Sequence, residues 1–295
     1  MLHSLIVRAM PLVPRPIMRR VASRYIAGET LEQALERVGH FARAGYPGVL
    51  DLLGEDVREE REARRALTTY RAAADGIAER SLDCHVSVKP THFGLNLDSS
   101  LALELYAELA AHCRERGVFL RVEMEDHPTT DATLRVFGEL HSEHPNVGIV
   151  LQSRLLRTTQ DIDSLSPEGL DVRMVKGVYI EPEDIAHTEP EPIRAAFVAA
   201  CERLWERGAR VCLATHDQAL GARLILSVGK LCKSHEDYEF QVLMGVQEAL
   251  WERWRTAGHP VRVYVPFGPQ WRAYSQRRLS RNPDLLRAVL RNAFR

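Results

Sequence analysis

The chain has 295 residues, of which 45% are hydrophobic and 27% charged, and these ordinary globular values exclude a disordered, collagen-like or coiled-coil protein. Its 39 basic and 40 acidic residues leave a formal net charge of -1, so no overall field attracts nucleic acid and we expect no nucleic acid partner. The five cysteines are widely separated and lack CxxC spacing, which argues against a disulfide framework or zinc site and favours a cytoplasmic location.

The first twenty residues, MLHSLIVRAMPLVPRPIMRR, hold a short apolar stretch that prolines interrupt. No apolar run in the chain approaches the roughly 20 residues that a membrane span needs, so we expect no transmembrane segment. Arginines among apolar residues leave two interpretations of this segment open. It is either a surface-seeking segment that makes peripheral contact with the inner face of the membrane, or an ordinary helix packed on the fold.

Short apolar runs alternate with amphipathic stretches along the rest of the chain. Stretches such as 101–117 and 193–208 carry apolar residues at three- and four-residue spacing and end on glycine, as helices do. Further helices are expected at about 31–44, before the first run, and 283–294, after the last. The eight runs, which we predict to be strands, are GVLDLLG, CHVSVKP, VFLRVEM, VGIVLQ, VRMVKG, RVCLATH, YEFQVLM and VRVYVPFG.

Eight strands that alternate with helices predict parallel pairing and an α/β fold. In a chain of this length they favour a closed (β/α)8 TIM-type barrel, with extra N-terminal helices and a C-terminal helix, over an open sheet. Because no low-complexity linker interrupts the pattern, we expect a single domain over residues 1–295.

The active site of such a barrel lies at the carboxyl ends of its strands, and polar residues are found there in this sequence. Arg173 and Lys176 interrupt an otherwise apolar run, and a buried, unpaired cation costs several kcal/mol or more, in order of magnitude. We therefore expect an anionic ligand at the barrel mouth. The other polar residues at predicted strand ends are Lys89, Glu123, Glu125, Gln152, Tyr179, Thr215, His216, Asp217, Gln241 and Tyr264.

This ordered set resembles the proline dehydrogenase family in its monofunctional, bacterial, FAD-dependent form. VRMVKGVYIEP is similar to the family's R-L-V-K-G-A-Y-x-E/D stretch, and RVYVPFGPQWRAYSQRRL to its closing Y-x-P-x-G…Y-x-x-R-R-L stretch. VLQ, ATHD and FQVLMG occur between them in the expected order. The resemblance implies oxidation of L-proline to Δ1-pyrroline-5-carboxylate by hydride transfer from substrate C5 to flavin N5. By the same resemblance, this oxidation is the first step of proline catabolism, and a quinone is the electron acceptor.

The resemblance also implies a role for each residue. Arg173 is placed near flavin N5, where a cation favours hydride acceptance, and Gly177 allows close approach of the backbone. The residues that would hold FAD are Gln152, Arg173, Lys176, Gly177, Tyr179, Thr215, His216, Asp217 and Gln241. Those that would act on the substrate are Lys89, Arg277 and Arg278 at its carboxylate, Tyr179, Tyr264, Tyr274 and Met174 around its ring, and Glu123.

Each assignment has an ordinary alternative. Arg173 alone fits a salt bridge inside the barrel, and His216 a satisfied histidine at a strand end. Arg277 and Arg278 alone fit a solvated helix face, and Lys89 fits a side chain that extends from the rim into solvent.

Three positions depart from the family pattern. Glu123 stands where aspartate is usual, Arg154 lies where a tyrosine is usual, and Arg281 replaces an acidic residue. We expect Glu123 to reach toward Arg277 or Arg278 in compensation. Because these changes lie near the site, a related cyclic amino acid such as hydroxyproline stays an alternative substrate.

Two other classes of function remain open. A metal-dependent barrel hydrolase would use His216, Asp217, Glu123 and Lys176, but no strand carries the paired histidines that such barrels need, and we expect no metal. The HSEH sequence at 141–144 lies on a predicted outer helix and is expected to be solvated surface. The third class is a flavin-binding protein that has lost turnover.

Overall fold

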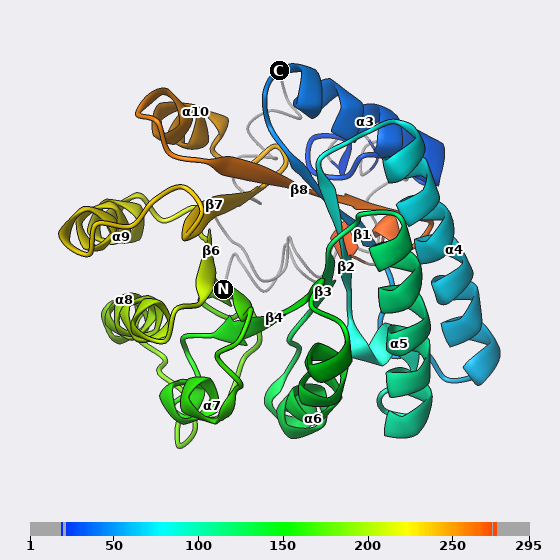
Figure 1. Ribbon diagram of the computed structural model, residues 1–295, viewed down its shortest axis with the longest axis horizontal. Helices are drawn as coiled ribbons and strands as arrows, with labels where there is room; N and C mark the ends of the chain where they lie inside the picture. The colour runs from blue at the N-terminus through cyan, green and yellow to red at the C-terminus, as the bar shows by residue number, and fades with distance from the viewer. Residues whose placement is uncertain (1–18, 20–21, 273, 276–295) are drawn as a thin grey trace, which may run out of the picture.

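The computed structural model describes residues 19, 22–272, 274 and 275. Eight parallel strands pair in sequence order, and the last pairs with the first, so the sheet closes into a barrel that helices surround (Figure 1). The strands are β1 (Gly48–Leu52), β2 (Cys84–Val88), β3 (Leu120–Val122), β4 (Val147–Gln152), β5 (Asp171–Val175), β6 (Arg210–Ala214), β7 (Tyr238–Leu243) and β8 (Val261–Phe267).

Helices lie on the outside of the barrel, α3 before β1 and the others between consecutive strands, which confirms the predicted (β/α)8 fold. They are α3 (Leu31–Arg43), α4 (Glu60–Glu79), the 3-10 helix η2 (Pro90–Phe93), α5 (Ser99–Glu115), α6 (His127–Glu143), α7 (Thr158–Ser164), α8 (Pro190–Glu206), α9 (Gln218–Lys230) and α10 (Glu248–Thr256).

Every predicted apolar run overlaps one strand of the barrel, although β5 begins at Asp171, one residue before its run. The helix predicted near 31–44 is α3, which begins with a capping box between Thr30 and Gln33. The predicted C-terminal helix at 283–294 and the N-terminal segment 1–18 lie outside the described residues, and the single-domain organisation stays a prediction. No helix in the described part of the chain is both long and apolar enough to cross a membrane.

Side chains of each strand point alternately into the barrel and toward the helices, and β5 shows why a cation can lie within an apolar run. Val172 and Met174 are fully buried in the hydrophobic core. Arg173 points inward instead, because its guanidinium contacts Ser87 on β2 and Gln241 on β7, strands that do not neighbour β5. The inward positions of this barrel are therefore available to polar residues.

A buried ionic network fills the amino-terminal half of the barrel, a region that bulky apolar side chains usually occupy. Arg121 Nη2 lies 2.6 Å from Asp171 Oδ1, and Arg210 links Asp171 to Glu239 at 3.1 and 2.8 Å. Arg262 Nε lies 2.8 Å from the other Glu239 oxygen. Because each buried charge in this network faces an opposite charge, the usual penalty for charge burial is offset.

The HSEH sequence lies at the end of the outer helix α6, as predicted, but the expectation of a solvated surface was wrong for its histidines. His144 is buried, and the ring nitrogens of the half-buried His141 lie 3.2 Å from the Val147 carbonyl and 2.8 Å from that of Glu168. The His141 contacts tie the end of α6 to the first residue of β4 and to the Glu168 carbonyl, which gives this histidine a structural role.

Candidate functional site

A cavity of about 450 Å³ lies at the carboxyl ends of the strands. Its walls combine charged groups with tyrosine rings and apolar side chains, the mixture typical of small-molecule sites. The lining residues are Glu55, Lys89, Glu123, Arg173, Val175, Val178, Tyr179, Ala214, His216, Gln241, Val242, Leu243, Tyr264 and Tyr274.

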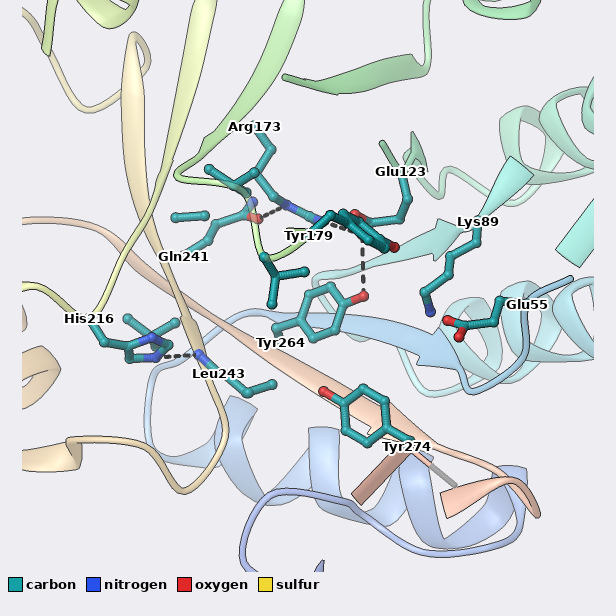
Figure 2. Close-up of a pocket in the computed structure, with 14 residues that line it drawn as sticks. Glu55, Lys89, Glu123, Arg173, Tyr179, His216, Gln241, Leu243, Tyr264 and Tyr274 are labelled. Atoms are coloured by element: carbon teal, nitrogen blue, oxygen red, sulfur yellow. Dashed lines mark hydrogen bonds and ion pairs between the residues drawn. The ribbon is translucent and has the colours of Figure 1, made fainter. Parts of the chain in front are cut away.

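Arg173 and Glu123 form the central ion pair of this cavity, as Figure 2 shows. Glu123 Oε1 accepts hydrogen bonds from Arg173 Nη1, from Ser87 and from the Tyr264 hydroxyl at 3.2 Å. Burial, the largest single cause, would raise the pKa of Glu123, but the charges of Arg173 and Lys89 and the hydrogen bonds from Ser87 and Arg173 together outweigh it and lower that pKa below its usual range. The carboxylate therefore stays ionised and holds the guanidinium inside the barrel.

Two further contacts fix the Arg173 guanidinium. Its Nε donates to Gln241 Oε1 at 2.5 Å, and its carbon lies 5.1 Å from the centre of the Tyr264 ring, a cation–π arrangement. Nη2 is buried and has no hydrogen-bond partner among the described residues. The buried Arg173 cation therefore has one nitrogen, Nη2, whose N–H groups make no hydrogen bond within the described residues.

Lys89 contributes a second positive charge from the end of β2. Its Nζ lies 3.5 Å from Asp51 Oδ2, and both side chains are largely buried. Burial alone would lower the pKa of Lys89, but the carboxylates around it, Asp51 foremost, raise that pKa above its ordinary value. Lys89 is therefore a protonated amine at neutral pH.

A second cavity of about 310 Å³ shares Lys89, Glu123 and Tyr179 with the first and extends over Gln152, Lys176 and Gly177. Gly177 has a φ of +94°, and a Cβ there would lie 2.8 Å from Gln152 Oε1. Only glycine adopts this backbone conformation and fits beside Gln152 without strain. The bare backbone of Gly177 therefore forms part of the wall of the smaller cavity.

Residues 34–286, which include all eight strands of the barrel, match the sequence model of the proline dehydrogenase family. The chain belongs to the proline dehydrogenase family.

Curated members of the family are similar over nearly the whole chain. The proline dehydrogenase of Deinococcus radiodurans is 32% identical over 280 residues, which are 91% of this chain and 88% of that protein. Proline dehydrogenase 1 of Bacillus subtilis subsp. natto is 29% identical over 278 residues, 93% of this chain and 91% of that protein.

Among solved structures, proline utilization A from Bdellovibrio bacteriovorus inactivated by N-propargylglycine superimposes with a TM-score of 0.81 at 25% identity. The match covers 88% of this chain and 32% of that one, so the chain spans about a third of the length of that polypeptide.

The barrel brings most of the residues predicted from the proline dehydrogenase pattern together. Those that line the larger cavity are Lys89, Glu123, Arg173, Tyr179, His216, Gln241, Tyr264 and Tyr274. Gln152, Lys176 and Gly177 line the smaller one. His216 Nε2 accepts a hydrogen bond from the Leu243 backbone N–H at 2.9 Å, which orients its ring at the wall.

Asp217 and Thr215 line neither cavity. Asp217 is the N-cap of α9, where its Oδ1 accepts hydrogen bonds from backbone N–H groups of the first turn. Its Oδ2 pairs with Lys176 and, at 2.7 Å, with Arg194. Thr215 Oγ1 accepts from the Asp217 backbone N–H at 3.1 Å. These two residues position Lys176 and the start of α9 and do not border the space.

Met174 does not line the cavities either, because it lies on the outward face of β5 in the hydrophobic core. The expectation that it encloses a ring was wrong. Arg277 and Arg278 lie outside the described residues, so their role as a carboxylate clamp stays a prediction.

The sequence pattern missed several groups of the site, including Asp51, Glu55 and Ser87. Asp51 was detectable as an acidic residue within the apolar run GVLDLLG, the same signal that identified Arg173. Arg154, noted only as a departure, donates to the Tyr179 carbonyl, and its backbone N–H donates to the Lys176 carbonyl at 3.1 Å. It thereby holds the loop that carries Tyr179.

Proposed function

We propose that this protein oxidises L-proline to Δ1-pyrroline-5-carboxylate with FAD held at the barrel mouth, the first step of proline catabolism. Membership of the proline dehydrogenase family supports the reaction. The observation that carries the cofactor assignment is the buried Arg173 guanidinium, whose Nη2 lacks a partner in the described part of the chain. An unsatisfied buried donor costs about 1–3 kcal/mol, so an electronegative ligand atom that accepts from Nη2 would be stabilised there.

The residues of the two cavities fit a flavin. The bound cofactor supplies an acceptor, N5, for a hydride from substrate C5. Arg173 supplies a fixed positive charge that favours the added electron density, and Gly177 leaves room for close approach. The residues assigned to the cofactor are Gln152, Arg173, Lys176, Gly177, Tyr179, His216 and Gln241, with Thr215 and Asp217 in support.

The substrate would bind on the side of the cavity that Lys89 borders. Its carboxylate would pair with Lys89, Arg277 and Arg278, because guanidinium and ammonium groups make strong charge-assisted hydrogen bonds to carboxylates. Tyr179, Tyr264 and Tyr274 would enclose its ring. Since hydride transfer needs only a neutral amine in the correct position, no dedicated acid or base is assigned.

A related cyclic amino acid such as hydroxyproline would meet the same charges, so it remains the second candidate substrate. The metal-dependent hydrolase receives no support from the side chains it requires. Glu123 pairs with Arg173, Lys176 with Asp217, and His216 accepts from Leu243. No group of three or more metal-ligating side chains occurs within the described residues.

The electron acceptor follows from the family resemblance, and we assign a quinone. Val178 and Ile180, on the loop after β5, are 60% and 90% exposed, and Val178 also lines both cavities. Exposed apolar side chains beside the cavity suit an apolar acceptor. We place the protein in the cytoplasm, and reduction of a quinone would bring it to the inner face of the membrane as a peripheral contact.

An absorbance spectrum tests the proposal. The purified protein, reconstituted with FAD if necessary, should show a flavin spectrum that anaerobic L-proline bleaches and that D-proline leaves intact. Preferential bleaching by hydroxyproline would assign the alternative substrate. Arg173→Ala should weaken flavin retention at least tenfold, while Arg173→Lys, which keeps the charge, should weaken it less. A colourless protein that takes up no FAD would contradict the proposal.

A further inference from the structure

Gln241 connects the candidate site to the buried ionic network of the barrel. Its Oε1 accepts from Arg173 Nε at 2.5 Å, while its Nε2 donates to Glu239 Oε1 at 2.7 Å. Glu239, Gln241 and Arg173 are each only 3% exposed. The amide is therefore held at both ends by buried partners of opposite charge.

An amide side chain can present either its oxygen or its nitrogen to a neighbour, but Arg173 can use only the oxygen because arginine has no acceptor. An ionised glutamate has only acceptors, so Glu239 can use only the nitrogen. Glu239 precedes Gln241 by two residues on β7, which places both side chains on the same face of the strand. The carboxylate thus selects the amide orientation that Arg173 requires.

Glu239 stays ionised because two arginines surround it. Arg262 Nε and Arg210 Nη2 each lie 2.8 Å from one of its oxygens. Burial alone would raise the pKa of Glu239, and the charges of Arg262 and Arg210 hold it well below the usual range. The carboxylate that holds the Gln241 amide is therefore ionised at neutral pH.

We propose that Glu239 is a positioning residue for the flavin reaction: through the Gln241 amide it fixes the Arg173 guanidinium, although it lines neither cavity itself. This inference rests on the proposed function, because it takes Arg173 to be the cation beside the flavin. It assigns to Glu239 an effect on the flavin reduction potential that is opposite in sign to the effect of its negative charge.

The sign of the effect on the flavin reduction potential distinguishes positioning from electrostatics. Removal of a negative charge from the barrel, by its field alone, favours the electron-rich reduced flavin and raises the potential. The amide of Glu239→Gln can offer Gln241 at most a neutral hydrogen bond in place of the charge-assisted one, which holds the Gln241 amide and the Arg173 cation less firmly and so lowers the potential. Glu239→Gln therefore lowers it only if Glu239 positions the amide.

Asp171 provides the matched control. It is a buried carboxylate of the same network, it pairs with Arg121 and Arg210, and no hydrogen bond links its side chain to Gln241. Asp171→Asn removes the same charge by the same chemical change. We expect the flavin of this variant to keep or raise its potential.

The experiment measures the flavin potential of the reconstituted wild type and of the Glu239→Gln, Asp171→Asn, Gln241→Leu and Glu239→Gln/Gln241→Leu variants. Glu239→Gln should weaken the preference for reduced over oxidised flavin about tenfold, which is about 30 mV for a two-electron couple. It should have no further effect when Gln241 is already leucine, because coupled residues do not add. If Glu239→Gln does not fold, Glu239→Asp keeps the charge, withdraws the carboxylate from Gln241 and should also lower the potential.

A second readout needs no flavin. The Arg173 Nε–H signal in a proton–nitrogen NMR spectrum should be protected from exchange in the wild type and in Asp171→Asn, and lose that protection in Glu239→Gln. An unchanged or raised potential in Glu239→Gln, or additive effects with Gln241→Leu, would overturn the inference and leave the proposed function intact. Failure of the wild type to bind flavin would overturn the proposed function and, with it, the catalytic role of Glu239.

Discussion

The guanidinium of Arg173 on β5 and the carboxylate of Glu123 just beyond β3 form an ion pair inside the barrel. Arg173 lies in the middle of its strand and Glu123 directly after its strand, and both side chains point inward, where Ser87 and Tyr264 also bond to Glu123. The ion-pair partner of Glu123 within the described residues is therefore Arg173, a residue assigned to the cofactor. Arg277 and Arg278, toward which the sequence predicts it to reach, lie outside the described residues.

Shortening the carboxylate of this pair should impair the enzyme. We expect Glu123→Asp to lower kcat/KM for L-proline, because the withdrawn carboxylate loses a charge-assisted contact worth about 1.5–3 kcal/mol, or roughly 10–100-fold. Tyr264→Phe, which removes one long hydrogen bond of 3.2 Å from an uncharged donor and keeps the ring, should cost less. Steady-state kinetics with matched flavin content makes the comparison. Wild-type kinetics in Glu123→Asp would show that the reach of the carboxylate is unimportant.

The predicted carboxylate clamp can be tested separately. Arg277→Ala and Arg278→Ala should each raise the KM for L-proline roughly 10–100-fold, since each removes a charged hydrogen bond to the substrate worth about 1.5–3 kcal/mol. Flavin affinity, measured by fluorescence titration, should not change. Arg255→Ala, on α10, serves as the control because this arginine lines neither cavity. An unchanged KM in both variants would return the pair to a solvated helix face.

Gly177 and Gly208 offer a matched pair of substitutions. Both have positive φ values, +94° and +77°, but only a Cβ at Gly177 meets neighbouring atoms. Each change to alanine should cost about 1–2 kcal/mol of unfolding free energy for the left-handed backbone. Gly177→Ala should lose more unfolding free energy than Gly208→Ala, because its Cβ displaces Gln152. For the same reason it should also weaken FAD binding. Equal stability and flavin affinity in the two variants would remove Gly177 from the cavity wall.

Glu125 should make stability depend on pH. Burial raises its pKa from an ordinary 4.5 to about 7, although hydrogen bonds from Thr91 and the charge of Lys89 oppose the shift. The folded state thus binds this proton more tightly than the unfolded state. The resulting stability is fully present below pH 4.5 and is lost as the pH rises through about 7.

Glu125→Gln, which imitates the protonated form, should therefore be more stable than the wild type at pH 8, by on the order of 2–3 kcal/mol. At pH 4.5 the two proteins should differ little. Urea unfolding at both pH values measures the difference, and a gap that does not change with pH would show that Glu125 titrates normally.

The barrel and its strands could be predicted because each strand is an apolar run that a helix follows. Arg173 could be predicted because a cation in such a run needs an explanation. Its partners could not, since which inward side chains meet depends on the register of eight strands closed into a ring. Glu239 carried the same signal within YEFQVLM, and it was missed because no family motif included it.

Asp217 shows the opposite limit. Its position after a predicted strand suggested a ligand, but an aspartate directly before a helix is also a typical N-cap, and its Oδ1 accepts from the backbone of Ala219 and Leu220. The sequence contains both signals. Only the geometry shows that one carboxylate caps a helix and pairs with Lys176 at the same time.

The ionic network below the site also joins distant parts of the chain. Arg262 on β8 donates to the Gly48 carbonyl on β1, across 214 residues, and Arg121 on β3 pairs with Asp171 on β5. A chain cut after β4 would leave Arg121 in one fragment and Asp171 in the other, each a charge without its counterpart. Half of this barrel is therefore a poor folding unit, and we expect the (β/α)8 ring to fold cooperatively, because Arg121 finds its counter-charge only in the other half.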